Sequence, residues 1–413
     1  MSSTAEIAEI QAKQAEEKVI AGSQIGVKYT DKGARHEKGK LNNFGHLTFW
    51  VGNAKQAAEW YCIRFGFKEW CYRGLETGSR EICSHVVKQN DVVFEFQSAL
   101  QPGNEKFGKF LETHADGVKD IAFNCEDVDA LIEKAREGGA VVVSEPETIS
   151  DEHGSIRTAV LQTYGDVCHT LIDRSNYPAD RHLPGYKFAT EMKNYRLDPV
   201  ADKMPSINLE FIDHCVGNQP NKGMEPVTQW YETNLLFHRF WSVDDSMMHT
   251  EYSALASTVV YFVELCVELP INEPAPGKKK SQIQEYCDFN GGAGVQHIAI
   301  RSHDIINTIR GLRARGMKFL VPPASYYTQL RENLKESKCV IKEDLDAIEE
   351  QNILIDYDDN GYLLQIFSLP VQDRPTLFIE IIQRANHNGF GAGNFKALFT
   401  AIELEQLQRG NLY

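Results

Sequence analysis

The sequence lacks the features that mark several specialised classes of protein. No apolar run is longer than a strand, so we predict no membrane span and no integral membrane association. No basic stripe offsets the net charge of -15, which argues against a nucleic-acid partner. The nine cysteines are odd in number and include no Cys-x-x-Cys pair, which indicates reduced thiols. These absences favour a globular protein of the cytoplasm.

The length of 413 residues is too great for one ordinary core and predicts two domains. Residues 1–27 are rich in Ala, Glu, Gln and Lys but too acidic for a transit peptide, so we expect a loosely ordered tail. Several prolines punctuate the polar segment 177–205, which we expect to be a linker. The predicted domains are therefore 28–176 and 206–413.

Two internal repeats divide these domains into modules. An offset of 177 relates six residues of the first half to identical residues of the second, which are Ile298, Ala299, Asp304, Ile309, Arg313 and Gly316. Both segments are typical of a strand, a helix and a glycine stop. An offset of 170 relates Trp60, Tyr61 and Phe67 to Trp230, Tyr231 and Phe237. The repeats predict four modules rich in β-α-β structure, arranged as two halves.

One carboxylate, Glu380, lies in the middle of an apolar run at 376–382 that predicts a buried strand. A buried carboxylate needs a cationic partner, unless the strand lies at an edge and Glu380 faces water. No Lys or Arg occurs in an equally apolar run, but His214 and His297 do. Each histidine alone could be an ordinary core residue. Together, two histidines and one carboxylate form the facial triad that suits a non-haem Fe(II) oxygenase.

The first half is predicted to lack such a triad. It keeps His46, but the counterpart of His297 is Asp120, and we expect no Glu inside an apolar strand of this half. Its predicted role is therefore structural, closing the architecture and forming an oligomer contact.

Five longer motifs resemble the 4-hydroxyphenylpyruvate dioxygenase family. They are LPINEP at 269–274, GKKKSQIQ at 277–284, GGAGVQH at 291–297, DRP at 373–375 followed by FIE at 378–380, and GFGAGNF at 389–395. The resemblance runs from about Tyr29 to Tyr413 and is greatest to the animal enzymes. It implies an α+β, vicinal oxygen chelate (glyoxalase/bleomycin-resistance-like) fold. In that fold, four βαβββ modules pair into two open-barrel domains, which agrees with the repeats.

The resemblance also implies the site. His214, His297 and Glu380 would bind one Fe(II) per subunit. The matching pocket residues are Ser257, Asn272, Gln282 and Gln296, expected to be catalytic, and Gln365, Phe367, Phe378, Phe390, Asn394 and Phe395, expected to bind substrate. Aromatic rings can pack on a phenol, and amides and a hydroxyl can orient its polar ends. Phe390 fits the pocket and the core equally well.

The implied activity is the Fe(II)-dependent conversion of 4-hydroxyphenylpyruvate and O2 to homogentisate and CO2, in tyrosine and phenylalanine catabolism. A homodimer is implied as well. Two alternatives remain open. One is a 4-hydroxymandelate synthase, which shares the substrate, the triad and the fold. The other is a non-catalytic vicinal oxygen chelate protein that only binds small molecules.

The C-terminal segment predicts a gating helix at 394–408. Asn394 can cap it after the glycine-rich stretch 389–393, and Phe395, Leu398, Phe399 and Ile402 fall on one face. We expect this helix to cover the mouth of the barrel as a lid. The alternative is a fixed packing helix.

Overall fold

The computed structural model describes residues 27–29, 38–192, 200–243, 253–262 and 267–412, without the side chain of Lys396. The predicted tail therefore lies outside the described residues except for Val27. That residue belongs to a short strand, β1 (Val27–Lys28), which pairs with β12 (His238–Val243) of the second half.

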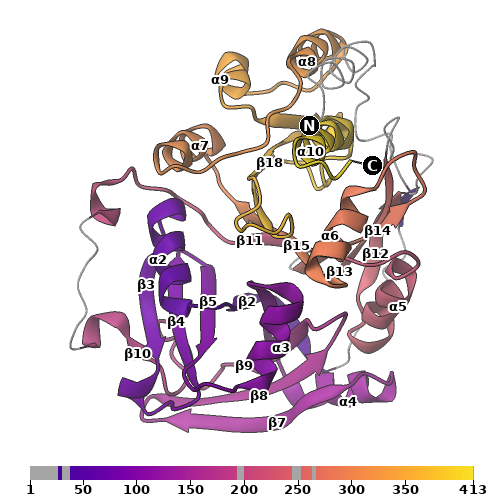
Figure 1. The fold of residues 1–413 in the computed structure, drawn as a ribbon. Helices are drawn as coiled ribbons and strands as arrows, with labels where there is room; N and C mark the ends of the chain where they lie inside the picture. Colours follow the sequence, from indigo (N-terminus) through magenta and orange to yellow (C-terminus); the bar gives the residue numbers. More distant parts are fainter. Residues whose placement is uncertain (1–26, 30–37, 193–199, 244–252, 263–266, 413) are drawn as a thin grey trace.

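Within the described residues, the strands form two nine-stranded sheets, one in each half of the chain (Figure 1). The first runs in the order β10-β3-β4-β5-β2-β6-β9-β8-β7 and consists of β2 (Lys40–Trp50), β3 (Lys68–Arg73), β4 (Ile82–Gln89), β5 (Val92–Ala99), β6 (Gly117–Glu126), β7 (Val142–Asp151), β8 (Gly154–Gln162), β9 (Cys168–Asp173) and β10 (Lys187–Phe188). The second runs in the order β1-β12-β13-β14-β11-β15-β18-β17-β16 and adds β11 (Ile212–Asn218), β13 (Ala254–Phe262), β14 (Val267–Ala275), β15 (Gly294–Arg301), β16 (Leu354–Tyr357), β17 (Tyr362–Phe367) and β18 (Phe378–Ala385).

Each sheet contains two modules of one strand, one helix and three further strands. The helices of the four modules are α2 (Ala54–Phe65), α4 (Val128–Glu137), α5 (Met224–Asn234) and α7 (Ile305–Ala314). In every module the first strand pairs in parallel with the last, and the two first strands of a half pair with each other antiparallel. The α+β fold of four βαβββ modules in two curled sheets is therefore confirmed.

The remaining helices connect or extend these modules. They are η2 (Leu75–Thr77), α3 (Glu105–His114), η3 (Ala189–Glu191), η4 (Ala201–Lys203), α6 (Gln282–Asn290), α8 (Ala324–Glu336), α9 (Leu345–Glu350), η6 (Ala392–Asn394) and α10 (Phe395–Gln408). None of the helices in the described ranges is long and apolar enough to cross a membrane.

The repeated residues occupy equivalent places in the two halves. Asp127 and Asp304 both cap a helix, and their carboxylates accept from the backbone N–H three residues later. Gly139 and Gly316 follow these helices with φ angles of +86° and +85°, a conformation that favours glycine. The predicted sequence of strand, helix and glycine stop is confirmed in both halves.

The segment 177–205, predicted to be a linker, adds structure to the first sheet over its described part. β10 pairs with β3, and His182 is buried beside Glu95. The proposed domain boundaries at 176 and 206 stay a prediction.

The prediction that no Glu lies inside an apolar strand of the first half is wrong. Glu95 lies in β5 between Phe94 and Phe96 and is only 2% exposed. Its carboxylate accepts hydrogen bonds from Tyr186 Oη at 2.5 Å and from Gln97 Nε2 at 2.7 Å. Gln97 is close in sequence, but Tyr186 lies 91 residues away, so the run around Glu95 did not show how its charge would be stabilised.

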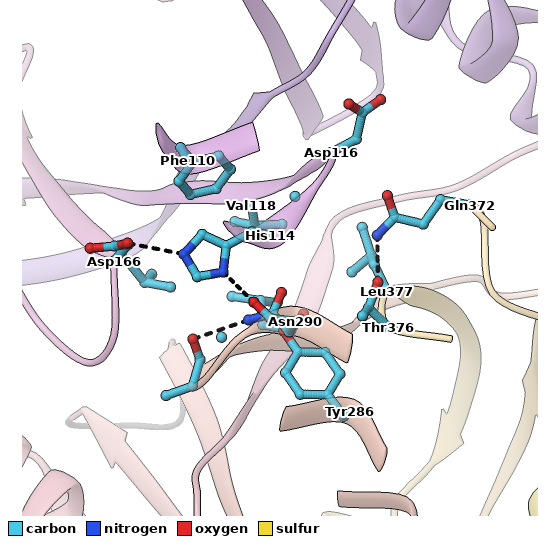
Figure 2. A pocket seen from close by; sticks show the side chains of 15 residues that line it. Phe110, His114, Asp116, Val118, Asp166, Tyr286, Asn290, Gln372, Thr376 and Leu377 are labelled. Carbon is cyan, nitrogen blue, oxygen red and sulfur yellow. Dashed lines mark hydrogen bonds and ion pairs between the residues drawn. The ribbon is translucent and has the colours of Figure 1, made fainter. Parts of the chain in front are cut away.

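The two halves share a packed junction. His114, at the end of α3, contacts the carbonyl oxygen of Asn290 through Nδ1 at 2.5 Å and the carboxylate of Asp166 through Nε2 at 3.0 Å (Figure 2). Arg374 reaches across the same junction and donates to the carbonyl oxygen of Thr113 at 2.6 Å. One apolar core cluster includes residues of both halves. The junction therefore holds the second sheet, with its candidate site, firmly against the first.

Candidate metal centre and substrate pocket

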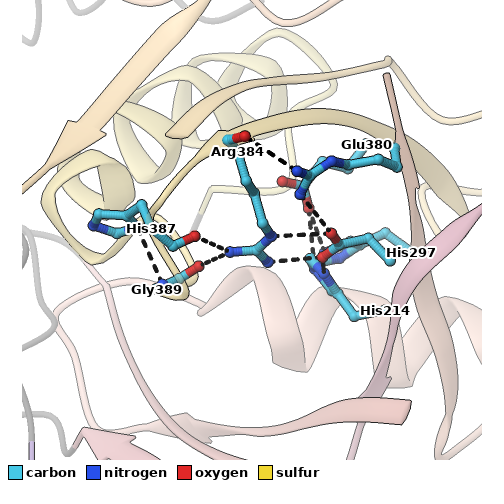
Figure 3. Close-up of polar contacts among 8 residues, drawn as sticks. His214, His297, Glu380, Arg384, His387 and Gly389 are labelled. Atoms are coloured by element: carbon cyan, nitrogen blue, oxygen red, sulfur yellow. Dashed lines mark hydrogen bonds and ion pairs between the residues drawn. The ribbon is translucent and has the colours of Figure 1, made fainter. Parts of the chain in front are cut away.

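Three neighbouring strands of the second sheet bring the predicted triad together. His214 on β11 pairs with Ala299 on β15, and Ala299 in turn pairs with Glu380 on β18. Glu380 Oε2 lies 3.3 Å from His214 Nε2 and 3.2 Å from His297 Nε2 (Figure 3). All three residues are at most 9% exposed. Glu380 is thus in a buried strand with two histidines beside it, and the alternative of a water-facing edge strand is wrong.

The geometry of the triad fits a divalent cation. Two atoms each bound about 2.1 Å from one ion, at right angles, lie roughly 3.0 Å apart. The observed separations of 3.2 and 3.3 Å are close to that value. In addition, Glu380 Oε1 is buried and has no hydrogen-bond partner, which is costly for a carboxylate oxygen. A bound cation would remove that cost.

Hydrogen bonds on the far side of each imidazole direct its Nε2 towards Glu380. His297 Nδ1 donates to Gln296 Oε1 at 2.9 Å, and His214 Nδ1 donates to Asp213 Oδ1 at 2.8 Å. Because each Nδ1 carries the donated proton, each Nε2 can present a lone pair to a metal. Gln296 is therefore placed to orient His297, one of the three candidate metal-ligating residues.

Asp213 and Arg384 support the triad, and the sequence reasoning missed both. Arg384 donates to Asp213 with two nitrogens, at 2.9 and 2.7 Å, and also to the carbonyl oxygens of His387 and Gly389. Burial by itself would raise the pKa of Asp213, but the charge of Arg384 outweighs burial and holds this pKa well below its usual range. The sequence does offer one indication of Asp213, because this residue directly precedes His214. Nothing in the sequence connected it with an arginine 171 residues away.

The electrostatics of the triad favour a bound positive charge. Burial lowers the pKa of His214, but hydrogen bonds to Asp213 and Glu380 outweigh it and raise the pKa to about 9. Burial raises the pKa of Glu380, and the two histidines bring it below its ordinary value. Burial lowers the pKa of His297. The group thus stabilises one added positive charge, which either a proton or a metal ion can supply.

Three predicted aromatic residues surround the triad. The Phe378 ring stacks on His297 at 4.8 Å, and Phe367 meets the same imidazole edge-on at 6.0 Å. Phe390 lies edge-on to His214 at 5.2 Å. Phe390 is half-buried and also belongs to an apolar cluster, so it contacts both pocket and core. These rings form an apolar wall suited to a flat aromatic ligand.

The polar candidates lie on elements around the triad. Ser257 and Asn272 are opposite each other on β13 and β14, so their side chains share one face. Asn272 Nδ2 donates to Asn218 Oδ1 at 3.2 Å. Gln282 begins α6 and lines, with Gln296 and Phe378, a cavity of about 40 Å³. Ile402 and Glu405 of α10 also line this cavity, as does Arg409, which directly follows the helix.

Asn394 and Phe395 connect the C-terminal helix to the barrel. The prediction that Asn394 caps α10 through its side chain is wrong, because a 3-10 turn precedes the helix and Asn394 itself has helical backbone angles. In the amide orientation that satisfies its neighbours, Asn394 donates to Ile355 O at 2.8 Å and accepts from Gln365 Nε2 at 3.1 Å. Phe395 stacks on Trp241 at 6.0 Å, in the same apolar cluster as Phe390.

Comparisons with known proteins agree with this geometry. Two models described as the glyoxalase/bleomycin resistance protein/dioxygenase superfamily match residues 45–158 and 211–366. The 4-hydroxyphenylpyruvate dioxygenase of Danio rerio is 57% identical over 384 residues, which is 93% of this chain and 96% of the relative. The enzyme of the same name from Caenorhabditis elegans is 55% identical over 389 residues, with the same two shares.

A solved structure shares the fold of this chain. A triply substituted 4-hydroxymandelate synthase from Streptomyces coelicolor has a TM-score of 0.75 at 27% identity, and the match covers 89% of this chain and 99% of that one. The near-complete coverage and the identity of the animal relatives decide the assignment. The chain belongs to the glyoxalase/bleomycin resistance protein/dioxygenase superfamily and, within it, to the 4-hydroxyphenylpyruvate dioxygenase family.

Proposed function

We propose that the protein converts 4-hydroxyphenylpyruvate and O2 to homogentisate and CO2, with one Fe(II) held by His214, His297 and Glu380. The convergence of these side chains on β11, β15 and β18 carries the proposal. The chemical types suit iron, since two imidazoles and one carboxylate leave further coordination positions open. The metal supplies the activation of dioxygen, and the chain supplies its position and surroundings.

The described residues can perform three tasks for this reaction. Phe367, Phe378 and Phe390 place the phenol ring beside the metal ligands through aromatic contacts. Ser257 and Asn272 offer hydrogen bonds to the polar ends of the substrate without competing strongly as iron ligands. The buried setting excludes water, which suppresses side reactions of an oxidising centre.

Oxygen uptake separates an enzyme from a protein that only binds small molecules. We expect the iron-loaded protein to consume O2 when 4-hydroxyphenylpyruvate is added, without a separate 2-oxo acid, because the substrate carries its own. An oxygen electrode measures this directly, with the metal-free protein as the control. Tight binding of the substrate without any oxygen uptake would favour the non-catalytic alternative.

We further propose that α10 is a lid over the site. Gly391 precedes it with a φ of +73°, so the chain changes direction where the helix begins. Ile402 and Glu405 of the helix line the small cavity beside Gln282 and Gln296. Movement of α10 would therefore change the access of water to the substrate.

A substitution at the base of the lid tests this proposal. Phe395→Ala removes the stacking on Trp241, so we expect the iron content to stay unchanged while the O2 consumed per homogentisate rises above one. The matched control is Leu404→Ala on the same helix, because Leu404 packs in a separate cluster with Leu407 and Leu412. If Phe395→Ala keeps iron and remains fully coupled, α10 is a fixed packing helix.

We also propose a homodimer located in the cytoplasm. The edge strand β7 exposes Val143 and Ile149, which are 55% and 38% accessible and could form a contact between subunits. The eight cysteines within the described ranges are free thiols, as expected of a reducing compartment. A light-scattering mass of one chain would contradict the dimer, and recovery outside the cytosolic fraction would contradict the location.

A further inference from the structure

A second buried group of metal-ligating side chains lies in the first half of the chain. His46 on β2, Glu95 on β5 and His182, between β9 and β10, are 5%, 2% and 3% exposed. Glu95 Oε2 lies 3.5 Å from His46 Nε2 and 3.4 Å from His182 Nε2. We propose that these three residues bind a second divalent metal ion, distinct from the one in the C-terminal half.

The strand register gives His46 and Glu95 the same relative positions as His297 and Glu380 in the C-terminal half. β2 is parallel to β5, and Glu95 pairs with the residue two positions after His46. β15 is parallel to β18, and Glu380 pairs with the residue two positions after His297. Because side chains two residues apart on a strand share a face, each sheet aims one histidine and one glutamate at the same point. The first half thus repeats most of the ligand framework of the second.

The third ligand comes from a different element, which explains why the internal repeat did not reveal the site. Asp120 on β6 pairs with the residue two positions after His46, as His214 on β11 pairs with the residue two positions after His297. Asp120 therefore has the position in the first sheet that His214 has in the second. Asp120 instead accepts hydrogen bonds from the backbone and hydroxyl of Thr170, at 3.2 and 2.9 Å. His182 takes the third place, and the ring of Tyr186 holds it edge-on at 4.7 Å.

The distances within the group suit a metal ion better than hydrogen bonds. Tyr186 and Gln97 bind Glu95 Oε1, which leaves Oε2 facing the two imidazoles. Charge-assisted N–H···O bonds are about 2.7–2.9 Å long, and both contacts to His46 and His182 are longer, at 3.5 and 3.4 Å. Two ligand atoms about 2.1 Å from one ion in tetrahedral geometry lie roughly 3.4 Å apart. The arrangement therefore fits three ligands of one divalent ion, such as Zn²⁺.

The fourth coordination position can face a large cavity. A cavity of about 1090 Å³ lies in the first half, and its lining includes His46, Glu95 and Tyr186. Aromatic side chains such as Trp50 and Phe107 line other parts of it. An ion can therefore enter from solvent, and water or a small ligand can complete its coordination. Three protein ligands with one open position are typical of exchangeable rather than closed structural zinc sites.

Metal counting tests the proposal. The metal-free full-length protein, dialysed against Zn²⁺ or Co²⁺, should hold two equivalents per subunit, and Glu380→Gln should hold one. Adding His182→Ala or Glu95→Gln to Glu380→Gln should remove that last equivalent, and with it the visible absorption of tetrahedral Co²⁺. The matched control is His153→Ala, because His153 lies in the same half but outside the group. It should leave both equivalents in place.

Two results would overturn the proposal. Glu380→Gln protein that holds no metal ion would show that the group around Glu95 is only a hydrogen-bonded network. Retention of the second equivalent after both His182→Ala and Glu95→Gln would place that ion elsewhere. Because the count is made in the Glu380→Gln background, it does not depend on the proposed dioxygenase activity.

Discussion

Glu380→Gln should remove one equivalent of iron per subunit and reduce turnover by at least about a thousandfold. The substitution keeps the shape of the side chain but removes the only negative charge among the three ligand side chains. A neutral amide in this buried strand no longer balances a cation facing two neutral imidazoles. A metal supplies several kcal/mol of stabilisation in such a reaction, and about 1.4 kcal/mol corresponds to a tenfold change in rate.

The measurement is iron content after dialysis, together with the steady-state rate of homogentisate formation. Glu210→Gln is the matched control, because Glu210 carries the same carboxylate just before β11 but pairs with the exposed His303, at 2.9 Å, and belongs to neither metal-ligating group. It should change neither quantity. Full turnover with undiminished iron in Glu380→Gln would show that the triad is assigned wrongly.

Asp213→Asn should destabilise the fold and weaken the binding of iron. Arg384 is buried and makes two hydrogen bonds to Asp213, so the substitution leaves its charge unbalanced. Breaking one partner of a buried ion pair costs about 3–5 kcal/mol. The same change weakens the acceptor that orients His214, and loss of such support typically lowers metal affinity by about 10–100-fold.

Urea unfolding and competition with an iron chelator measure the two effects separately. Asp288→Asn is the control, because its partner Lys280, at 3.0 Å, is at the surface and the pair should contribute less than about 1 kcal/mol. The double variant Asp213→Asn/Arg384→Gln should recover part of the lost stability without recovering the affinity for iron. Unchanged stability and unchanged affinity in Asp213→Asn would show that the pair of Asp213 and Arg384 supports neither the fold nor the metal ligands.

The parts of the fold that repeat could be predicted from the sequence. Identical residues at a fixed offset, such as Asp127 and Asp304, report the same helix start in both halves because the local hydrogen bonds are the same. His214, His297 and Glu380 could be found because each polar side chain stands out in an apolar run. Patterns within single segments were therefore enough to predict both the modules and the triad.

Contacts between distant segments could not be predicted in this way. Arg384 lies 171 residues from Asp213, and His182 lies 87 residues from Glu95, in a proline-rich segment without hydrophobic periodicity. Asn394 matched a helix cap by residue type, but the 3-10 turn before α10 directs its side chain to the barrel. In each case the tertiary fold decided the partner.

Identification of the product is the direct test of the proposed reaction. The iron-loaded protein is incubated with 4-hydroxyphenylpyruvate and O2, and the products are separated and identified by mass spectrometry and NMR. We expect homogentisate, formed in equal amount to the O2 consumed, with release of CO2. Formation of 4-hydroxymandelate instead, or recovery of unchanged substrate from protein with iron bound at His214, His297 and Glu380, would contradict it.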